Sequence, residues 1–199
     1  SLRINALNKK MFETQEAPTP KEDLFKHLRL MREAHLENPM PDLEKRKDRL
    51  RRLLEGFQER EEVFTQSISE DFGLRSTFET ANYDITTTIG DLKHQLRNVA
   101  RWMRPRKRSV QLYLLPGRAR LLPQPLGVVG VISPWNFPLI LSIAPVAGAL
   151  AAGNRVMLKP SEYTPKTSKL LAQLATDCFE TDEFTVVEGG VEVGKAFSE

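Results

Sequence analysis

The amino-acid sequence predicts an α/β fold in which helices come first, a β-hairpin follows and a parallel sheet comes last. Three observations predict this order. Apolar residues recur at helical spacing as far as Arg104. Pro116-Gly117 then separates two extended segments. Finally, three short runs rich in β-branched residues alternate with helical stretches in residues 125–199.

The same patterns divide the chain into four segments. Residues 1–20 are polar and end in Ala17-Pro18-Thr19-Pro20, so we expect a flexible N-terminus. We expect residues 21–108 to form the helical part and 109–124 to form a hairpin. Residues 125–199 are expected to form part of a parallel sheet together with its helices.

The helical part is expected to begin with two amphipathic stretches. The first spans 21–36 and is stopped by a segment with two prolines, 38–41. The second spans 42–71, where Gly56 allows a break, and it ends at Phe72-Gly73. Both stretches present one apolar stripe, which indicates that they cover a core.

A third, longer helix is expected from Ser76 to Arg104. Ser76-Thr77-Phe78-Glu79 has the spacing of a capping box, in which the serine side chain accepts a helix N–H and the glutamate reaches back. An apolar stripe then continues for roughly six turns, until Pro105 ends the helix. The stripe consists of Ala81, Ile85, Ile89, Leu92, Leu96, Val99 and Trp102.

The formal net charge is +3, and two basic runs raise the question of nucleic-acid binding. The run 45–52 is interrupted and flanked by acidic residues. The run 97–108 lies around a helix C-terminus, where the helix dipole favours cations. We therefore interpret both runs as solvated faces and expect no nucleic-acid partner.

Residues 121–154 contain no charged side chain, a feature that they share with membrane-spanning helices. Five prolines interrupt this stretch, so no apolar helix long enough to cross a bilayer remains. Residues 1–20 also lack the apolar core of a signal peptide. Cys178 is the only cysteine, which excludes an internal disulfide and favours a reducing compartment, the cytoplasm.

Strands are expected at 126–132, 155–158 and 184–187, with helices at 138–152 and 165–179 between them. Strands and helices that alternate in this way form a parallel sheet with right-handed crossovers. Ligands of such sheets bind at the carboxyl ends of the strands. The segments that follow the strands are therefore the candidates for a functional site.

Two of these segments carry polar side chains with more than one interpretation. Asn136 stands between two prolines, where a rigid turn could aim its amide at a developing oxyanion, or where it simply turns the chain. Lys159 and Glu162 follow the second strand; they could face the hydroxyls of a ribose, or pair with each other at the surface. No complete G-x-G-x-x-G or Walker pattern is present, and no metal site is expected.

Three motifs occur together and in order: Pro134-Trp135-Asn136-Phe137-Pro138, the segment 148–154 (Gly-Ala-Leu-Ala-Ala-Gly-Asn) and Lys159-Pro160-Ser161-Glu162. In this combination the sequence resembles the NAD(P)-dependent aldehyde dehydrogenase superfamily from about residue 42 to residue 199. The long helix followed by a hairpin is similar to the branch with the class 3 and coniferyl aldehyde dehydrogenases. The resemblance implies the first half of a Rossmann-like sheet and a hairpin from the oligomerisation region.

The resemblance also implies roles for individual residues. Asn136 would donate its amide to the thiohemiacetal oxyanion, and Phe137 would border the aldehyde tunnel. Lys159 and Glu162 would hold the adenosine ribose, which favours NAD over NADP as the cofactor. The remaining cofactor-binding residues implied are Ile132, Pro134 and Trp135, which would line the cleft, and Gly189, which would let the backbone approach the adenine side.

The nucleophilic cysteine, the general-base glutamate and the Gly-Ser segment of the family have no counterpart in this sequence. Cys178 precedes the third strand, where the family has no nucleophile, so we interpret it as a small buried hydrophobe. The resemblance thus implies the N-terminal fragment of a dehydrogenase for an aldehyde, aromatic by branch, inactive alone and a homodimer or tetramer at full length. The alternative is a short binding or assembly module with the same fold.

Overall fold

The computed structural model describes residues 21–199, so the flexible terminus expected at 1–20 lies outside the described residues. At the centre of the fold is a parallel sheet of β3 (Val128–Ile132), β4 (Arg155–Lys159) and β5 (Phe184–Val186), in that spatial order. Helices α7 (Ile140–Ala151) and α8 (Pro165–Cys178) connect the strands. The predicted α/β class, with the strands and crossover helices close to their expected places, is confirmed.

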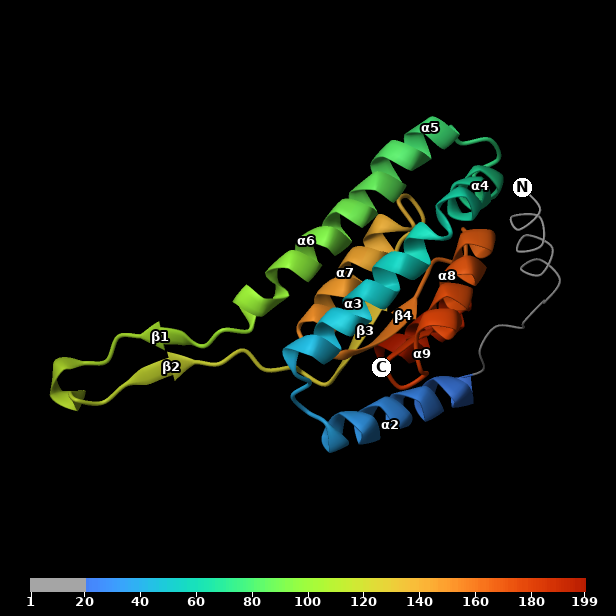
Figure 1. Cartoon of the computed structure of the whole chain (residues 1–199). Coiled ribbons are helices and arrows are strands. Elements are labelled where there is room, and N and C mark those ends of the chain that lie inside the picture. The colour runs from blue at the N-terminus through green and yellow to red at the C-terminus, as the bar shows by residue number, and fades with distance from the viewer. Residues whose placement is uncertain (1–20) are drawn as a thin grey trace.

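The helices form layers on the two faces of the sheet (Figure 1). Helices α7 and α8 cover one face, and α3 (Leu43–Gln58), α4 (Glu61–Asp71) and α6 (Thr86–Trp102) pack against their outer side. Helices α2 (Lys21–Glu37) and α9 (Val191–Ser198) cover the other face. Side chains of β4 alternate accordingly: Val156 and Leu158 belong to the large core, whereas Met157 packs in the smaller α2 core.

The first helices begin and end for identifiable reasons. Asp42 caps α3, because its Oδ1 accepts a hydrogen bond from the backbone nitrogen of Lys45 at 2.8 Å. The break expected near Gly56 occurs between Gln58 and Glu61. Gly56 itself lies against Cys178: a Cβ added to the glycine would stand within van der Waals overlap of the Cys178 sulfur. Glycine is therefore required there by the close approach of α3 and α8.

The long helix expected after Ser76 is present, but it contains a wider turn. Ser76 caps α5 (Thr77–Thr80), with its Oγ 3.4 Å from the nitrogen of Glu79. A π-helical segment, η1 (Ala81–Ile85), connects α5 to α6. The predicted stripe is buried at Ile85, Leu92 and Val99. The π segment was not predicted, and within it the side chain of Asp84 is fully buried.

The hairpin projects away from the helices and the sheet (Figure 1). Its strands are β1 (Arg106–Arg108) and β2 (Ala119–Leu121), which pair antiparallel. Of the two extended segments expected on either side of Pro116-Gly117, the first, at 110–115, is wrong, because a 3₁₀ turn, η2 (Leu112–Leu114), occupies it. The apolar residues there have no sheet face to pack on, and strand formation depends on such packing. Residues 106–108, which were expected at the end of the helical part, form the first strand instead.

Burial of the parallel strands differs from strand to strand. Every residue of β4 is buried, as expected for a central parallel strand. Strand β3 is an edge of the described sheet, and Ile132 at its end is 56% exposed. A strand rich in apolar and β-branched residues would be buried on both faces at the centre of a parallel sheet, but β3 is not, unlike β4. Helix α9 was not predicted. No helix among residues 21–199 combines the length and apolar character that a bilayer crossing requires.

Candidate active site

The segments that follow the three strands meet at one edge of the sheet. The backbone nitrogen of Ser133, just after β3, donates to the carbonyl of Lys159 at 3.1 Å. The nitrogen of Val187, just after β5, donates to the carbonyl of Leu158 at 2.8 Å. The backbone hydrogen bonds between the strands thus continue to the strand ends. They hold all three candidate segments at the carboxyl edge of the sheet.

The turn with Asn136 connects β3 to α7 and is tied at its ends. The Ser142 hydroxyl donates to the carbonyl of Pro138 at 2.5 Å and lies 2.7 Å from the Ser133 hydroxyl. Both serines are buried, whereas Trp135 and Asn136 are exposed at the apex. The buried serines therefore fix the base of the turn, and its apex exposes the Trp135 and Asn136 side chains to solvent.

Two residues outside the predicted motifs hold this turn from the helical layer. Arg75 donates through Nη1 to the carbonyl of Asn136 at 2.8 Å, and its guanidinium carbon lies 5.0 Å from the ring centroid of Phe137. The carboxylate of Asp84 accepts from the backbone nitrogens of Ile140 and Leu139 at 2.6 and 3.4 Å. Burial raises the pKa of Asp84, although both backbone bonds and the charge of Arg75 lower it.

The sequence contains only a weak signal for these two residues. Arg75 directly precedes the predicted capping box, and Asp84 directly precedes Ile85 of the apolar stripe. An acid on the buried side of a helix needs hydrogen-bond donors, which could have marked Asp84 as the partner of another element. Nothing in the spacing indicates which element that is.

Lys159 and Glu162 lie together after β4. Lys159 is 4% exposed, and its Nζ donates to Glu162 Oε2 at 2.7 Å. The hydrogen bond from Lys159 is the main reason why the pKa of the Glu162 carboxyl is lowered. Of the two interpretations given for these residues, a ribose site or an ion pair, the structure contains the ion pair. The Glu162 side chain lies at the surface.

A cavity of about 210 Å³ lies beside this pair, between the β4–α8 and β5–α9 connections. Its lining consists of Pro160, Ser161, Glu162, Pro165, Ser168, Glu188, Gly189 and Gly190. Gly189 has φ +152°, and a Cβ on it would stand 2.5 Å from Cγ2 of Val193. A side chain at Gly189 would therefore strain the turn into α9.

The predicted site residues thus form two groups at this edge. Glu162 and Gly189 share the cavity, and Lys159 is bonded to Glu162. Trp135, Asn136 and Phe137 form the second group, packed near Phe72 and Arg75; the rings of Trp135 and Phe72 are 6.0 Å apart. The last predicted residues, Ile132 and Pro134, are exposed at the end of β3 and do not line the cavity.

Cys178 lies at the C-terminal end of α8, which runs back across the sheet and so ends at the opposite edge from Asn136. The cysteine is half-buried and packs against the main core. Burial raises the pKa of the Cys178 thiol, so this environment does not produce a reactive thiolate. Among residues 21–199, no group of three or more metal-binding side chains gathers.

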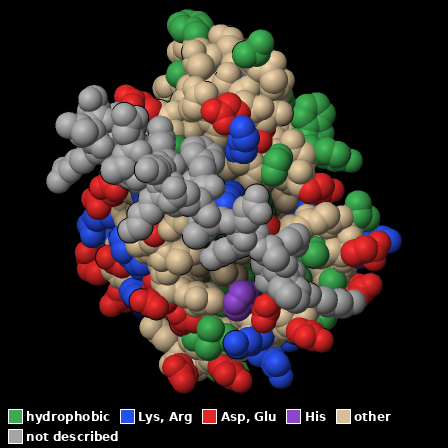
Figure 2. Space-filling view, turned by 90° about the vertical axis from the view of Figure 1, so that its right-hand side faces the viewer, with side chains coloured by type: hydrophobic (Ala, Val, Ile, Leu, Met, Phe, Trp, Pro, Cys, Tyr) green, Lys and Arg blue, Asp and Glu red, His purple; other side chains and the backbone are tan. Residues whose placement is uncertain are grey.

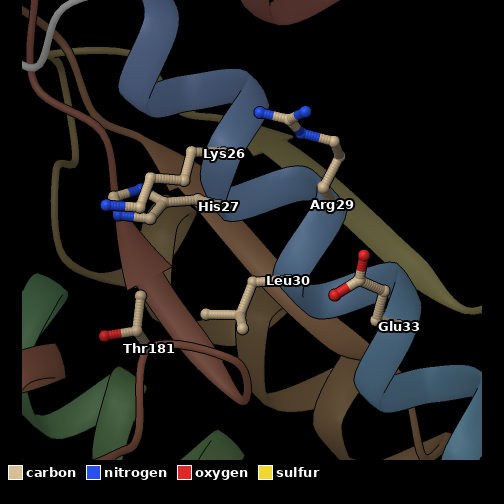
Figure 3. A pocket seen from close by; sticks show the side chains of 6 residues that line it. All are labelled: Lys26, His27, Arg29, Leu30, Glu33 and Thr181. Carbon is tan, nitrogen blue, oxygen red and sulfur yellow. The ribbon is translucent and has the colours of Figure 1, made fainter.

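A second cavity, of about 460 Å³, lies between α2 and Thr181. Figure 3 shows its lining: Lys26, His27, Arg29, Leu30 and Glu33 on α2, with Thr181 opposite. Thr181 precedes β5, so this cavity belongs to the amino edge of the sheet, away from Asn136.

Acidic and basic side chains are interspersed over the face shown in Figure 2, a mixture typical of a solvated surface.

Known proteins match nearly the whole chain. The model of the aldehyde dehydrogenase family matches residues 5–199. The coniferyl aldehyde dehydrogenase of Pseudomonas sp. (strain HR199 / DSM 7063) is 47% identical over 183 residues, which are 92% of this chain and 37% of that protein. Aldehyde dehydrogenase family 3 member A2 of Pongo abelii is 37% identical, over 83% of this chain and 34% of its own length.

Solved structures agree with this match. A substrate-bound AldH of Staphylococcus aureus superposes with a TM-score of 0.82 at 26% identity, over 89% of this chain and 38% of its own. The P. syringae indole-3-acetaldehyde dehydrogenase AldA in complex with NAD+ and IAA has a TM-score of 0.78 at 25% identity, over 92% and 37%. The chain spans little more than a third of these proteins, and within that part its sequence and fold show that it belongs to the aldehyde dehydrogenase family.

Proposed function

We propose that this chain forms the N-terminal part of an NAD-dependent aldehyde dehydrogenase, which oxidises an aldehyde to a carboxylic acid. The observation that carries the proposal is one cavity lined by Glu162 and Gly189, with Lys159 bonded to Glu162. This cavity lies at the same sheet edge as the anchored turn of Asn136. A ribose site and an oxyanion donor are needed together only by an enzyme that binds both a nucleotide and a carbonyl substrate.

The residues around the cavity fit the adenosine ribose of NAD. Glu162 remains ionised, because the hydrogen bond from Lys159 lowers its pKa, and it can accept from two ribose hydroxyls. The same carboxylate would repel a 2′-phosphate, so NAD is preferred and NADP is the alternative. On the other wall, Gly189 would let its backbone approach the adenine side of the nucleotide. When bound, NAD supplies the hydride acceptor.

Asn136 is proposed as the side chain that donates to the oxyanion of the substrate. An amide fixed before the reaction stabilises developing charge without reorganising. The nucleophile and the general base are assigned to the part of the relatives' length that this chain does not span. The 199 residues alone would then form a cofactor and oxyanion site without turnover.

Substrate and assembly are proposed from the relatives and the surface. A coniferyl or other aromatic aldehyde is supported by the relative that is 47% identical, and Phe137 would border its path. A homodimer or tetramer is supported by the projecting hairpin, whose exposed leucines have no partner surface within residues 21–199. These are Leu112, Leu114, Leu115, Leu121 and Leu122. The unpaired Cys178 supports the cytoplasm as the compartment.

The test uses the full-length protein that contains this sequence, assayed for NADH formation with coniferaldehyde, benzaldehyde and acetaldehyde. Asn136→Ala should lower kcat about 10²- to 10³-fold, the effect typical of losing one oxyanion donor. The control, Asn98→Ala, removes an exposed helical amide and should leave kcat unchanged. Equal turnover by Asn136→Ala would remove the role of Asn136. A full-length protein without aldehyde-dependent NADH formation would favour the binding module.

The cofactor assignment has its own test. Glu162→Gln removes the charge that faces a 2′-phosphate, and it should shift the ratio of kcat/KM values for NAD and NADP by about tenfold toward NADP. Glu192→Gln is the matched control, because Glu192 pairs with Lys195 on an exposed face of α9. An unchanged ratio in Glu162→Gln would contradict the ribose site.

A further inference from the structure

We propose that Arg75 is a positioning residue for Asn136: it fixes the apex of the turn and thereby the direction of the oxyanion-donating amide. The inference rests on the proposed function, since it deepens the role of Asn136. Arg75 lies outside all motifs discussed above, in the connection between α4 and α5, and it reaches Asn136 across 61 positions of sequence.

Arg75 makes three different contacts with one planar group. Its guanidinium carbon lies 4.9 Å from the ring centroid of Phe72 and 5.0 Å from that of Phe137. Its Nη1 donates to the carbonyl of Asn136 at 2.8 Å. The guanidinium thus connects the backbone of Asn136 to two aromatic rings. One cation therefore orders both the peptide of Asn136 and the neighbouring side chain of Phe137.

The environment holds Arg75 in this position. Its side chain is 9% exposed, although the turn that it contacts is at the surface. The charge is balanced by Glu79, whose Oε1 lies 3.5 Å from Nη2, and it also acts on buried Asp84. A cation that is both buried and compensated has little freedom to move. Lysine would keep the charge but would lose the planar contacts with both rings.

The position of the contact separates this role from simple support of the fold. Other groups hold the two ends of the turn. At the β3 end, the Ser133 backbone nitrogen donates to the Lys159 carbonyl and its hydroxyl lies 2.7 Å from that of Ser142. At the α7 end, Asp84 accepts from the backbone nitrogen of Ile140. Arg75 contacts neither end, but the carbonyl and the ring in the middle. Its loss should therefore leave β3 and α7 in place while it frees the apex that carries the Asn136 amide.

The first experiment is a double-mutant cycle in the full-length enzyme with Arg75→Ala, Asn136→Ala and the double variant. We expect Arg75→Ala to lower kcat about tenfold and to leave the KM for NAD unchanged, because Arg75 does not contact the Lys159–Glu162 pair. If Arg75 acts through Asn136, the double variant is no slower than Asn136→Ala. Thermal stability losses of the two single variants should instead add.

The matched control is Arg52→Ala. Arg52 also stacks on a phenylalanine, with its guanidinium carbon 4.6 Å from the Phe179 ring centroid, and also donates to a backbone carbonyl, that of Cys178. It lies at the other edge of the sheet, so its removal should lower the melting temperature without a comparable loss of kcat. Equal kcat losses in Arg52→Ala and Arg75→Ala would overturn the positioning role, as would additive kcat losses in the cycle.

A second readout does not depend on turnover. The 199-residue chain has two tryptophans, so Trp102→Phe leaves Trp135, next to Phe72, as its single tryptophan, which can be excited selectively over the tyrosines. In this background Arg75→Ala should raise the acrylamide quenching constant of Trp135 about twofold, and Arg52→Ala should not. Unchanged quenching in Arg75→Ala would overturn the inference. If the wild-type full-length protein shows no turnover, the proposed function fails, and this readout still decides whether Arg75 orders the turn.

Discussion

The carboxylate of Asp84 caps a helix to which it does not belong: its Oδ1 lies 2.6 Å from the backbone nitrogen of Ile140 at the start of α7. Asp71 does the same for α8, with its oxygens 3.1 and 2.9 Å from the nitrogens of Lys166 and Thr167. Neither crossover helix has a side-chain cap at its own N-cap residue. The outer helical layer thus supplies the negative groups that both helix N-termini require.

Asp84→Ala should lower the free energy of unfolding by about 2–3 kcal/mol, because it leaves the N–H groups of Leu139 and Ile140 without their acceptor. Asp84→Asn retains an acceptor oxygen and should cost less. Urea denaturation monitored by circular dichroism measures both values. If Asp84→Ala costs less than Asp91→Ala, at a half-buried aspartate of α6, the buried cap does not stabilise the helix.

Asp84 should also contribute a specific pH dependence. Because burial raises its folded-state pKa, the folded state binds the proton more tightly than the unfolded state does. The stability from this group is fully present below the unfolded pKa and is lost as pH rises through the folded pKa. The stability of Asp84→Asn relative to wild type should therefore increase with pH across this window. A constant difference would contradict the raised pKa.

Glu183 should have the opposite pH dependence. Although burial raises its pKa, hydrogen bonds from Lys45 and Arg52 and the charge of Arg49 lower it from 4.5 to about 2. The stability from this group is present above the unfolded pKa and is lost as pH falls toward 2. At about 1.4 kcal/mol per pH unit, about 3 kcal/mol depends on this carboxylate.

Glu183→Gln should abolish this loss and should destabilise the protein at neutral pH, since three cations would remain around a neutral side chain. Urea midpoints between pH 2 and pH 7 measure the effect. Glu192→Gln, an exposed carboxylate beside Lys195, is expected to retain the wild-type pH profile. Parallel profiles for wild type and Glu183→Gln would refute the assignment.

Gly189→Ala and Gly190→Ala form a matched pair one residue apart. Gly189 has φ +152° and a neighbour at 2.5 Å from the added Cβ, whereas the Cβ of Gly190→Ala meets no atom within 4 Å. Gly189→Ala should lower the free energy of unfolding by about 1–3 kcal/mol, and Gly190→Ala by less than about 1 kcal/mol. Thermal unfolding measures both; equal costs would show that the turn does not require a glycine at 189.

Cys178→Ala should leave turnover of the full-length enzyme within about twofold of wild type, because the thiol lies at the wrong edge of the sheet and burial raises its pKa. Alkylation of Cys178 by iodoacetamide in the 199-residue chain should be slower than alkylation of glutathione at the same pH. Loss of turnover without loss of stability would restore Cys178 as a candidate nucleophile.

The helices and strands whose side chains are buried in a regular pattern could be predicted from the sequence. The long helix and the buried strand β4 follow from the spacing of apolar residues, since one face or both must be removed from water. The first hairpin strand was misplaced, whereas β2 lies where the second extended segment was expected. The hairpin has no core to pack on, so apolar content carries no information about its register.

The contacts of the candidate site could be predicted only in part. The motif residues were found from short segments, and Lys159 and Glu162 do lie together because three positions separate them. Arg75 and Asp84 were missed, since their partners are 61 and 56 positions away in sequence. Such pairings depend on how the layers pack, which no periodicity encodes.

The layered arrangement has a consequence for the order of folding. Each pair of neighbouring strands in the parallel sheet is joined by a single crossover helix, so β3–α7–β4 and β4–α8–β5 can each form from one continuous stretch. The contacts that attach α3 to the sheet layer, such as that between Arg49 and Glu183 across 134 positions, must close a much larger loop. Pulsed hydrogen exchange during refolding should thus protect β4 before α3, and the buried charges of Arg49 and Glu183 should remain hydrated until the last step.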